Sequence, residues 1–444
     1  MKTIQRIAAF VLTFALVANA TFAATFTVND SGDASDAAAG NSSCATAGAV
    51  CTLRAALEEA NALAGTDTIV FSADSRTLTP ASTLSVDSTL TIDGNGSPTN
   101  MITIDGNDGA YDLITVTSNG DSSTIEGLYL IDGGQDGIQI NSGADTVTIG
   151  TLTSQQGNII GLTTASAADG MAAAGVHNQG TNTTILGNVI SSNAIGIKLT
   201  DGSKDVTIMG NTLGSDGQVT LTRGNGTGIS VTGTVALDGG NGGTEGLVIG
   251  QLNTIVNSTD DGIHIGNGAG AITGTVKIQR NNIGMTSGGT AMANTDEGII
   301  AEVDASGADI TIGTDGDGSS DSVEGNYIGS NGNRGINIQD ADDLVIAGNK
   351  VGINSSGTAR ANTGTGILVG TSSVGPNTVR IGSDNADANE INTIGNNGAG
   401  GISVLNGTTV TIAGNYIGLN TSGAGSHGNT GAGISIASGG GGGQ

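Results

Sequence analysis

Val206–Leu213 reads VTIMGNTL, and close copies of this phrase return as LVIAGNKV at Leu344–Val351 and VTIAGNYI at Val410–Ile417. Apolar residues alternate along the first half of each phrase, and Gly-Asn follows. This pattern is typical of a half-buried strand that ends in a turn. With weaker copies included, the phrase places asparagines at corresponding positions: Asn158, Asn188, Asn211, Asn253, Asn281, Asn326, Asn349, Asn392 and Asn415.

A second phrase, Gly-Ile followed by alternating residues, recurs between these asparagines. It begins at Gly196, Gly228, Gly262, Gly298, Gly335, Gly366, Gly401 and Gly433. The distance from the residue before the Asn to this glycine alternates, with 9 residues from Gly187 to Gly196 and 18 from Gly210 to Gly228. The repeating unit is therefore a short coil followed by a long coil, whose extra residues form an outward loop.

Units of this size cannot bury an apolar face alone, so we expect them to stack on their neighbours. The sequence predicts an all-β, right-handed parallel β-helix of about 12 coils, roughly 55–60 Å long at the usual strand spacing. The asparagines would form a ladder of amide hydrogen bonds in a tight bend, where Asn tolerates a positive φ. A ligand groove built from the same asparagines is the weaker alternative.

The N-terminus has the order of a secretory signal peptide. Lys2 and Arg6 precede an apolar run over residues 7–17, and Ala20 and Ala23 offer cleavage positions. The run is shorter than the roughly 20 residues of a membrane-spanning helix, and we expect no transmembrane segment in the mature chain. We predict a signal peptide at 1–23, an N-terminal cap at 24–80, β-helix repeats at 81–436 and a Gly-rich tail at 437–444.

The chain is strongly acidic, with 13 Lys+Arg against 40 Asp+Glu. Nucleic-acid binding requires basic residues that neutralise phosphates, so this role is disfavoured. An anionic polymer would also be repelled unless cations intervened. Cys44 and Cys51 predict one disulfide in an exported protein, and a metal site is the weaker interpretation.

An amphipathic helix is expected after the second cysteine. Its apolar face would consist of Leu53, Leu57, Ala60 and Ala64. Thr52 can serve as the N-cap, and Gly65 is expected to end the helix. A solenoid needs a cap over its first coil to cover apolar surface and an open sheet edge, and this helix fits that role.

The stretch Cys51–Ala56 (CTLRAA) resembles the CSLREA-type domain, whose Cys-Ser-Leu-Arg-Glu-Ala motif precedes parallel β-helix repeats in bacterial surface and secreted proteins. Thr52 stands in place of the Ser, and Ala55 in place of the Glu. The repeats that follow are similar to those of the pectin lyase-like superfold. The resemblance implies the fold but no activity, because that superfold includes lyases, hydrolases, epimerases, adhesins and structural rods.

The best candidate for acid–base chemistry is the sequence DDGIH, in which Asp260, Asp261 and His264 lie close together. Adjacent carboxylates beside a histidine can hold and transfer a proton. The phrase resembles one element of the polygalacturonase-type glycosidases, but the other elements of that site are missing from the sequence. Because its Gly-Ile also belongs to the structural repeat, these residues are weak catalytic candidates.

A calcium site is the better-supported functional prediction. A Gly-containing loop carries four carboxylates at its positions 1, 3, 7 and 10: Asp315, Asp317, Asp321 and Glu324. Calcium takes oxygen ligands from flexible acidic loops of this kind. A looser version returns at Asp384, Asp387 and Glu390. The alternative is a pair of solvated acidic loops without metal.

We therefore expect a secreted or cell-surface β-helix with an adhesive, glycan-binding or structural role and a polysaccharide or cell-surface glycan as its partner. The alternative is a polysaccharide lyase, glycoside hydrolase or epimerase that uses long-coil loops near Arg223, Arg280 and Arg360. A cleft between such loops would favour the enzyme. The last repeat ends at Ile436 without a recognisable cap, so a partner or a further segment is expected to cover it.

Overall fold

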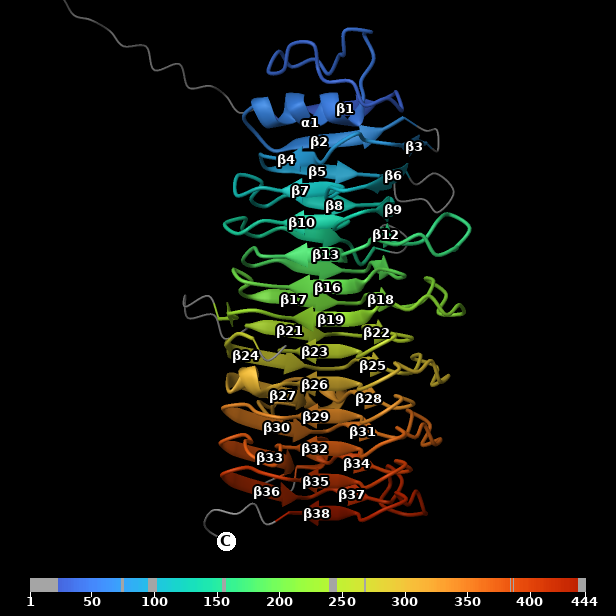
Figure 1. Cartoon of the computed structure of the whole chain (residues 1–444), viewed down its shortest axis with the longest axis vertical. Helices are drawn as coiled ribbons and strands as arrows, with labels where there is room; N and C mark the ends of the chain where they lie inside the picture. The colour runs from blue at the N-terminus through green and yellow to red at the C-terminus, as the bar shows by residue number, and fades with distance from the viewer. Residues whose placement is uncertain are drawn as a thin grey trace, which may run out of the picture.

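The computed structural model describes residues 23–437, apart from 73–75, 95–101, 154–156, 239–245, 267–268, 384 and 386. The signal peptide predicted at 1–23 falls almost wholly outside the described residues, and so does Asp384. The strands form three parallel sheets wound around one axis, so the chain is a right-handed parallel β-helix, as the repeats predict. Figure 1 shows the resulting rod, with a helix at one end and β38 at the other.

Each coil adds one strand to each sheet, and we number the sheets by the order of the strands in the first complete coil, β4, β5 and β6. Sheet 1 consists of β4 (Leu84–Val86), β7 (Ile114–Val116), β10 (Ile138–Ile140), β13 (Ala174–Asn178), β16 (Ile195–Leu199), β19 (Thr227–Val231), β23 (Ile263–Ile265), β26 (Ile299–Ala301), β29 (Ile336–Ile338), β32 (Ile367–Val369), β35 (Ile402–Val404) and β38 (Ile434–Ile436). These twelve strands agree with the expected number of coils.

Sheet 2 begins before the first complete coil. It consists of β1 (Thr25–Val28), β2 (Asp67–Phe71), β5 (Leu90–Asp93), β8 (Thr124–Glu126), β11 (Thr148–Gly150), β14 (Thr184–Leu186), β17 (Val206–Met209), β20 (Val235–Ala236), β21 (Leu247–Gly250), β24 (Ile272–Ile278), β27 (Gly307–Gly313), β30 (Asp343–Ala347), β33 (Thr378–Gly382) and β36 (Thr409–Ala413). Since β1 and β2 belong to it, the segment 24–80 is continuous with the solenoid.

Sheet 3 is made mostly of two-residue strands. It consists of β3 (Thr77–Leu78), β6 (Ile102–Gly109), β9 (Leu128–Gly133), β12 (Ile159–Ile160), β15 (Val189–Ile190), β18 (Thr212–Leu213), β22 (Thr254–Ile255), β25 (Asn282–Ile283), β28 (Tyr327–Ile328), β31 (Lys350–Val351), β34 (Thr393–Ile394) and β37 (Tyr416–Ile417). The loops of the long coils leave the rod after these strands, between sheet 3 and sheet 1.

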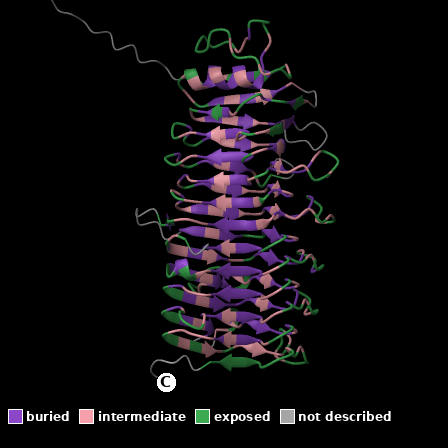
Figure 2. Ribbon diagram, in the orientation of Figure 1, coloured by how far each residue is buried: buried purple, intermediate pink, exposed green. Residues whose placement is uncertain are grey.

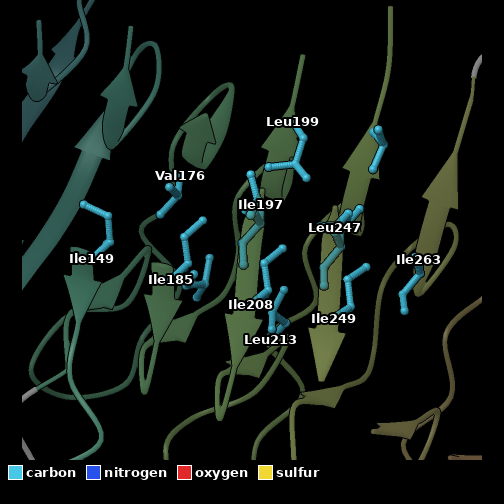
Figure 3. Close-up of a cluster of buried hydrophobic side chains, with 14 of the residues drawn as sticks. Ile149, Val176, Ile185, Ile197, Leu199, Ile208, Leu213, Leu247, Ile249 and Ile263 are labelled. Carbon is cyan, nitrogen blue, oxygen red and sulfur yellow. The ribbon is translucent and has the colours of Figure 1, made fainter. Parts of the chain in front are cut away.

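The core is a set of stacked apolar rows. Parallel pairing in register places Ile149, Ile185, Ile208 and Ile249 directly above one another in sheet 2, and all are fully buried. Figure 3 shows this row facing the residues of sheet 1 across the interior. Each such side chain contributes about 1.5–3 kcal/mol on burial, and every coil adds several of them. Outward residues between them stay partly exposed, as Figure 2 shows.

The predicted helix covers the first coil. Helix α1 (Leu53–Ala62) begins at Thr52, whose side chain accepts a hydrogen bond from the Ala55 amide. Its buried face contacts β1, β2 and β4. The helix ends at Ala62, before the glycine that the sequence suggested, and Ala64 is exposed because the chain has by then left the helical path.

The loop before α1 is attached to the helix by several contacts. A disulfide joins Cys44 to Cys51. The carboxylate of Glu59 is fully buried and accepts hydrogen bonds from the amides of Gly40 and Ser42. Arg54 pairs with Asp33 at 2.9 Å between Nε and Oδ1. These bonds satisfy the buried charge and hold the loop over the end of the rod.

At the opposite end of the rod, the last coil is exposed within the described part of the chain. β38 is the last strand of sheet 1, and its Ile434 and Ile436 are 46% and 68% exposed. Figure 2 shows this strand as the exposed strand at the end of the stack. The partner or segment expected over this coil stays a prediction. Among the described residues, no helix is long and apolar enough to cross a membrane.

The nine asparagines of the repeat form a continuous hydrogen-bonded row between sheets 2 and 3, which we call the first ladder. From Asn158 to Asn392, each Nδ2 donates to the Oδ1 of the next Asn at 2.9–3.1 Å. The expected positive φ at these residues is wrong. At six of the nine positions the residue before the Asn takes that conformation instead. Four of these residues are glycines, such as Gly187 (φ 67°) and Gly348 (φ 74°), and the other two are Leu252 and Arg280. A positive φ is costly for residues with a Cβ, which glycine lacks. The Asn that follows keeps an ordinary φ, and its side chain points along the ladder.

A second ladder lies between sheets 3 and 1, and the sequence analysis missed it. Its hydrogen bonds run through Asn294, Asn331, Asn362, Asn397 and Asn429 at 2.8–3.0 Å, and earlier through Asn193 and Asn225 at 3.2 Å. A signal was present, because each of these asparagines precedes the Gly-Ile phrase by three or four residues.

Candidate functional site

The DDGIH sequence lies at the start of β23, in the middle of sheet 1. Pairing of β23 with β26 and of β26 with β29 stacks its residues on those of the next two coils. Positions just before the three strands therefore form short rows across the sheet. We call the resulting group the sheet 1 cluster; it consists of Asp260, Asp261, His264, Asp296, Glu297, Glu302 and Arg334.

His264 is held between two carboxylates. Its Nδ1 lies 2.8 Å from Oδ2 of Asp261, and its Nε2 lies 3.2 Å from Oε1 of Glu302. Burial opposes the charged imidazolium, but hydrogen bonds and charges from these two carboxylates outweigh it and raise the pKa of His264. Both ring nitrogens are therefore engaged, which leaves neither free to act as a base without rearrangement.

Glu297 is the centre of a second network. It is 4% exposed, and its Oε1 accepts hydrogen bonds from Arg334 at 2.6 Å, Asn333 at 3.1 Å and Asn337 at 3.2 Å. Burial, a hydrogen bond with Asp296 and the surrounding negative charge raise the pKa of Glu297 to about 7, although Arg334 acts in the opposite direction. Glu297 is therefore partly protonated near neutral pH.

The two networks are joined through Asp261. This residue is 3% exposed, and its Oδ1 accepts a hydrogen bond from the Glu297 amide at 2.9 Å. Carboxylate oxygens of Asp261, Asp296 and Glu297 lie within 4.8 Å of one another, as do ligand atoms of Asp260, Asp261 and His264. The structure thus brings the three weak catalytic candidates together and surrounds them with further charged groups.

Four members of the sheet 1 cluster were missed from sequence: Asp296, Glu297, Glu302 and Arg334. The first two were recognisable, because DEGI at 296–299 repeats DDGI at 260–263 one coil later. NRGI at 333–336 is the next copy, and it brings Arg334. Glu302 had no such signal, because its contact with His264 spans 38 residues and depends on the pairing of β23 with β26.

A second histidine on sheet 1 has similar surroundings. His177 on β13 lies 2.8 Å from Asp136 through Nδ1 and 2.8 Å from Thr200 through Nε2. Asp136 also accepts a hydrogen bond from the Ala174 amide. Both nitrogens of His177 are engaged, as in His264, but the described residues place no second acidic pair beside it comparable to Asp296–Glu297. The His177–Asp136 pair therefore resembles the His264–Asp261 pair but, within the described chain, is not part of a larger group of charged residues like the sheet 1 cluster.

The loop predicted to bind calcium lies between β27 and β28, and we call residues 314–325 the acidic loop. Ligand oxygens of Asp315, Asp321 and Glu324 lie within 4.8 Å of one another. Asp317 is directed elsewhere, because its Oδ1 accepts a hydrogen bond from the Ser319 amide at 2.7 Å. In the looser version, Asp387 accepts a hydrogen bond from the Asn389 amide, ahead of η2 (Ala388–Glu390).

The three arginines that could have formed a catalytic cleft lie apart. Arg223 and Arg360, in long-coil loops, donate through Nε to the backbone oxygens of Ser166 and Gly289 in the preceding long loops. Four steps along sheet 3 separate their coils, about 19 Å at the usual strand spacing. These arginines therefore support loop structure.

Arg280 lines a groove of about 470 Å³ on the outer side of sheet 3. Tyr327, Lys350 and Tyr416 line the same groove, and Lys350 Nζ lies 5.1 Å from the ring centre of Tyr327. Burial lowers the pKa of Lys350. The groove offers aromatic and cationic surface, separate from the acidic groups of sheet 1.

Comparison with known proteins adds little about activity. No protein-family model and no curated protein matches the chain. Among solved structures, it is similar to the A-module of the mannuronan C-5 epimerase AlgE4 of Azotobacter vinelandii, with 16% identity over 93% of this chain and 97% of that one and a TM-score of 0.43. It is also similar to the pectate lyase Pel9A, with 11% identity over 77% and 79% of the two chains and a TM-score of 0.39.

A third similar structure is PfbA, a surface adhesin of Streptococcus pneumoniae. Identity is 11% over 93% of this chain and 92% of that one, with a TM-score of 0.38. At these values the similarity concerns the parallel β-helix architecture, and it carries no argument about what this chain binds or does.

Proposed function

We propose that the protein is an exported, non-catalytic β-helix that binds glycans through the outer face of sheet 1. The supporting observation is a column of outward side chains that the strand register places one above another. Six of its seven members from β10 to β29 are polar: Gln139, His177, Lys198, Ser230, His264, Ile300 and Asn337. His177, Lys198 and His264 are partly exposed and offer the accessible contacts, whereas the other four are buried. A column that repeats at strand spacing suits a linear ligand lying along the rod.

The bonding within the sheet 1 cluster favours binding over catalysis. His264 uses both nitrogens, and Oε1 of Glu297 already accepts three hydrogen bonds. Arg334 remains 32% exposed at its side chain, and Asp260 is exposed. Preorganised donors and acceptors of this kind can orient sugar hydroxyls without a proton transfer.

Charge restricts the class of glycan. The whole chain carries a formal charge of −27, and the sheet 1 cluster contains five carboxylates against one guanidinium and one imidazole. An anionic polysaccharide would be repelled from this face. We therefore propose neutral glycans as ligands, with export supported by the signal-peptide order of residues 1–23.

One observation favours a second candidate, cleavage of a polysaccharide at the same place. Glu297, with a pKa of about 7 beside Asp296, has the protonation behaviour of a general acid paired with a carboxylate base. In this case Glu297 would protonate the glycosidic oxygen, with Asp296 as the neighbouring carboxylate. Arg334 would have to move away from Glu297 to expose that proton.

A polysaccharide screen with the purified chain separates the two candidates. We expect co-sedimentation with an insoluble neutral polysaccharide, little with anionic polymers, and no new reducing ends or unsaturated products. R334Q should weaken this retention, whereas K277Q, on the outer side of sheet 2, should not. Products released by wild type and lost in E297Q would favour the enzyme. Retention unaffected by R334Q would place any binding surface elsewhere.

A further inference from the structure

The acidic loop folds so that three carboxylates from different parts of it converge. Asp315 follows β27, and Asp321 and Glu324 begin and end the short helix α2 (Asp321–Glu324). Gly316 and Gly318, with φ of 74° and 85°, turn the chain back between them. The three side chains offer oxygens within 4.8 Å of one another, a separation that a single bound cation can bridge.

Two oxygens in this group lack a protein partner. Asp321 is 7% exposed, and its Oδ2 accepts a hydrogen bond from the Gly318 amide at 3.2 Å. Its Oδ1 has no hydrogen-bond partner among the described residues, and neither has Oε2 of Glu324. A buried carboxylate oxygen without a partner is costly, and in a stable fold a bound water or ion can satisfy it. In the acidic loop two such oxygens belong to the group of three converging carboxylates.

The charge of the group identifies the kind of ligand. In the described part of the chain, one cationic group contacts these carboxylates: Lys277 Nζ lies 3.0 Å from Oδ2 of Asp315. Three carboxylates and one ammonium group leave two negative charges. Burial raises the pKa of Glu324, and the charges of Asp315 and Asp321 act in the same direction although a hydrogen bond from Thr314 opposes them.

A fourth carboxylate closes one side of the site. Glu390, at the end of η2, is 3% exposed and pairs with Arg380 at 2.9 Å. Its Oε1 lies 2.6 Å from where a Cβ on Gly316 would be, so the two loops touch. Arg380 neutralises the charge of Glu390. Glu390 therefore offers a further acceptor oxygen beside the acidic loop but does not change the net charge of the three converging carboxylates and Lys277.

We propose that Asp315, Asp321 and Glu324 together bind one divalent cation of the calcium type. Carboxylates from a flexible, irregular loop suit the variable oxygen coordination of calcium better than the strict octahedron of magnesium. The bound ion satisfies the two unpartnered oxygens and neutralises the remaining charge. The sequence spacing predicted four calcium ligands, and the structure reduces them to three. Asp317 is not a ligand, because its carboxylate accepts a hydrogen bond from the Ser319 amide. The proposal is independent of glycan binding on sheet 1.

The test is calorimetric titration of the whole chain, first stripped with a chelator, with calcium chloride and separately with magnesium chloride. We expect one calcium ion per chain, weaker binding of magnesium, and a calcium-dependent rise in Tm. The isosteric variants D321N and E324Q should each lower calcium affinity at least about tenfold, on the scale seen when groups around a metal are altered. D317N, in the same loop, is the matched control and should bind like wild type.

Circular dichroism and cooperative thermal unfolding establish that each variant keeps the fold, and E324Q provides the test if D321N does not fold. Absence of calcium binding by wild type would overturn the proposal. Equal affinity of wild type, D321N and E324Q would overturn it as well, because the ion would then bind elsewhere. Loss of affinity in D317N comparable to that in D321N would show a diffuse acidic surface rather than this site.

Discussion

The acidic loop and the loop at residues 383–391, here called the counterpart loop, occupy equivalent places but differ in how the charge of a glutamate is neutralised. Glu324 and Glu390 each stand two residues before an asparagine of the first ladder. In the counterpart loop, Arg380 on β33 pairs with Glu390. The register places Thr311 of β27 in the row of Arg380, with Val345 of β30 between them. Where the strand supplies arginine, the charge of the glutamate is neutralised, although Oε2 of Glu390 has no hydrogen-bond partner among the described residues. Where the strand supplies threonine, the carboxylates retain negative charge.

The largest expected effect comes from making the counterpart loop resemble the acidic loop. R380T leaves the buried Glu390 without its guanidinium, and removing one partner of a buried pair costs about 3 kcal/mol. We expect that loss in the free energy of unfolding from urea denaturation at neutral pH. T311V, in the equivalent row, should change it by less than about 0.5 kcal/mol. Equal effects of the two variants would contradict the comparison.

The buried glutamate of sheet 1 tests the comparison through pH. Glu297 contacts Arg334 but also faces Asp296, and its pKa rises from 4.5 to about 7. The folded chain therefore binds this proton more tightly than the unfolded chain. The resulting stability is present below about pH 4.5 and is lost as pH rises through about 7, by on the order of 1–3 kcal/mol. E297Q should flatten this decline between pH 5 and pH 8.

Urea denaturation of wild type and E297Q at both pH values measures this difference. His264, whose pKa is also raised, adds a loss of stability in the same direction at higher pH, so E297Q removes only part of the slope. The variant D317N, far from sheet 1, should keep the full slope. A slope unchanged in E297Q would mean that Glu297 does not hold a proton in the folded chain.

The reverse exchange makes the acidic loop resemble its counterpart. T311R places a guanidinium on the strand beside Glu324, where it can take the role of the proposed calcium ion. We expect calcium affinity to fall at least about tenfold, or about 1.4 kcal/mol, in the calorimetric titration. T311V controls for the loss of the hydroxyl and should bind calcium normally. If T311R bound calcium as tightly as wild type, an arginine on the strand would not replace the calcium ion, and the comparison of the two loops would be wrong.

The smallest effect concerns the cation already present. Lys277 pairs with Asp315 at a partly exposed position, where such a pair contributes about 0.2–1 kcal/mol. K277Q removes a positive charge that competes with calcium, so affinity should rise by about threefold. The same titration measures it, with K204Q as a control outside this loop. A decrease in affinity would indicate that Lys277 orients Asp315 for the ion.

Much of the fold was readable because the relevant signals are local. The alternation around Asn211 and Asn349 and the 9- and 18-residue arms are properties of short stretches, and identical stretches stack in register. The helix at Leu53–Ala62 followed from its cap and apolar face in the same way. The φ of the ladder asparagines was predicted wrongly because Gly-Asn offers two candidates for the left-handed position, and glycine is the less strained one.

The sequence by itself determined the coils, their alternation, the first ladder and the cap, since each depends on residues near one another in the chain. Tertiary structure decided the charge contacts between coils, whereas Asp261 and His264 are neighbours in the sequence. Glu302 reaches His264 across 38 residues, and Glu390 reaches the acidic loop across an intervening coil. Such contacts depend on which coils are neighbours and on loop length, which no short stretch encodes. Strand register places Thr311 in the row of Arg380, which pairs with Glu390 ten residues later in its own coil.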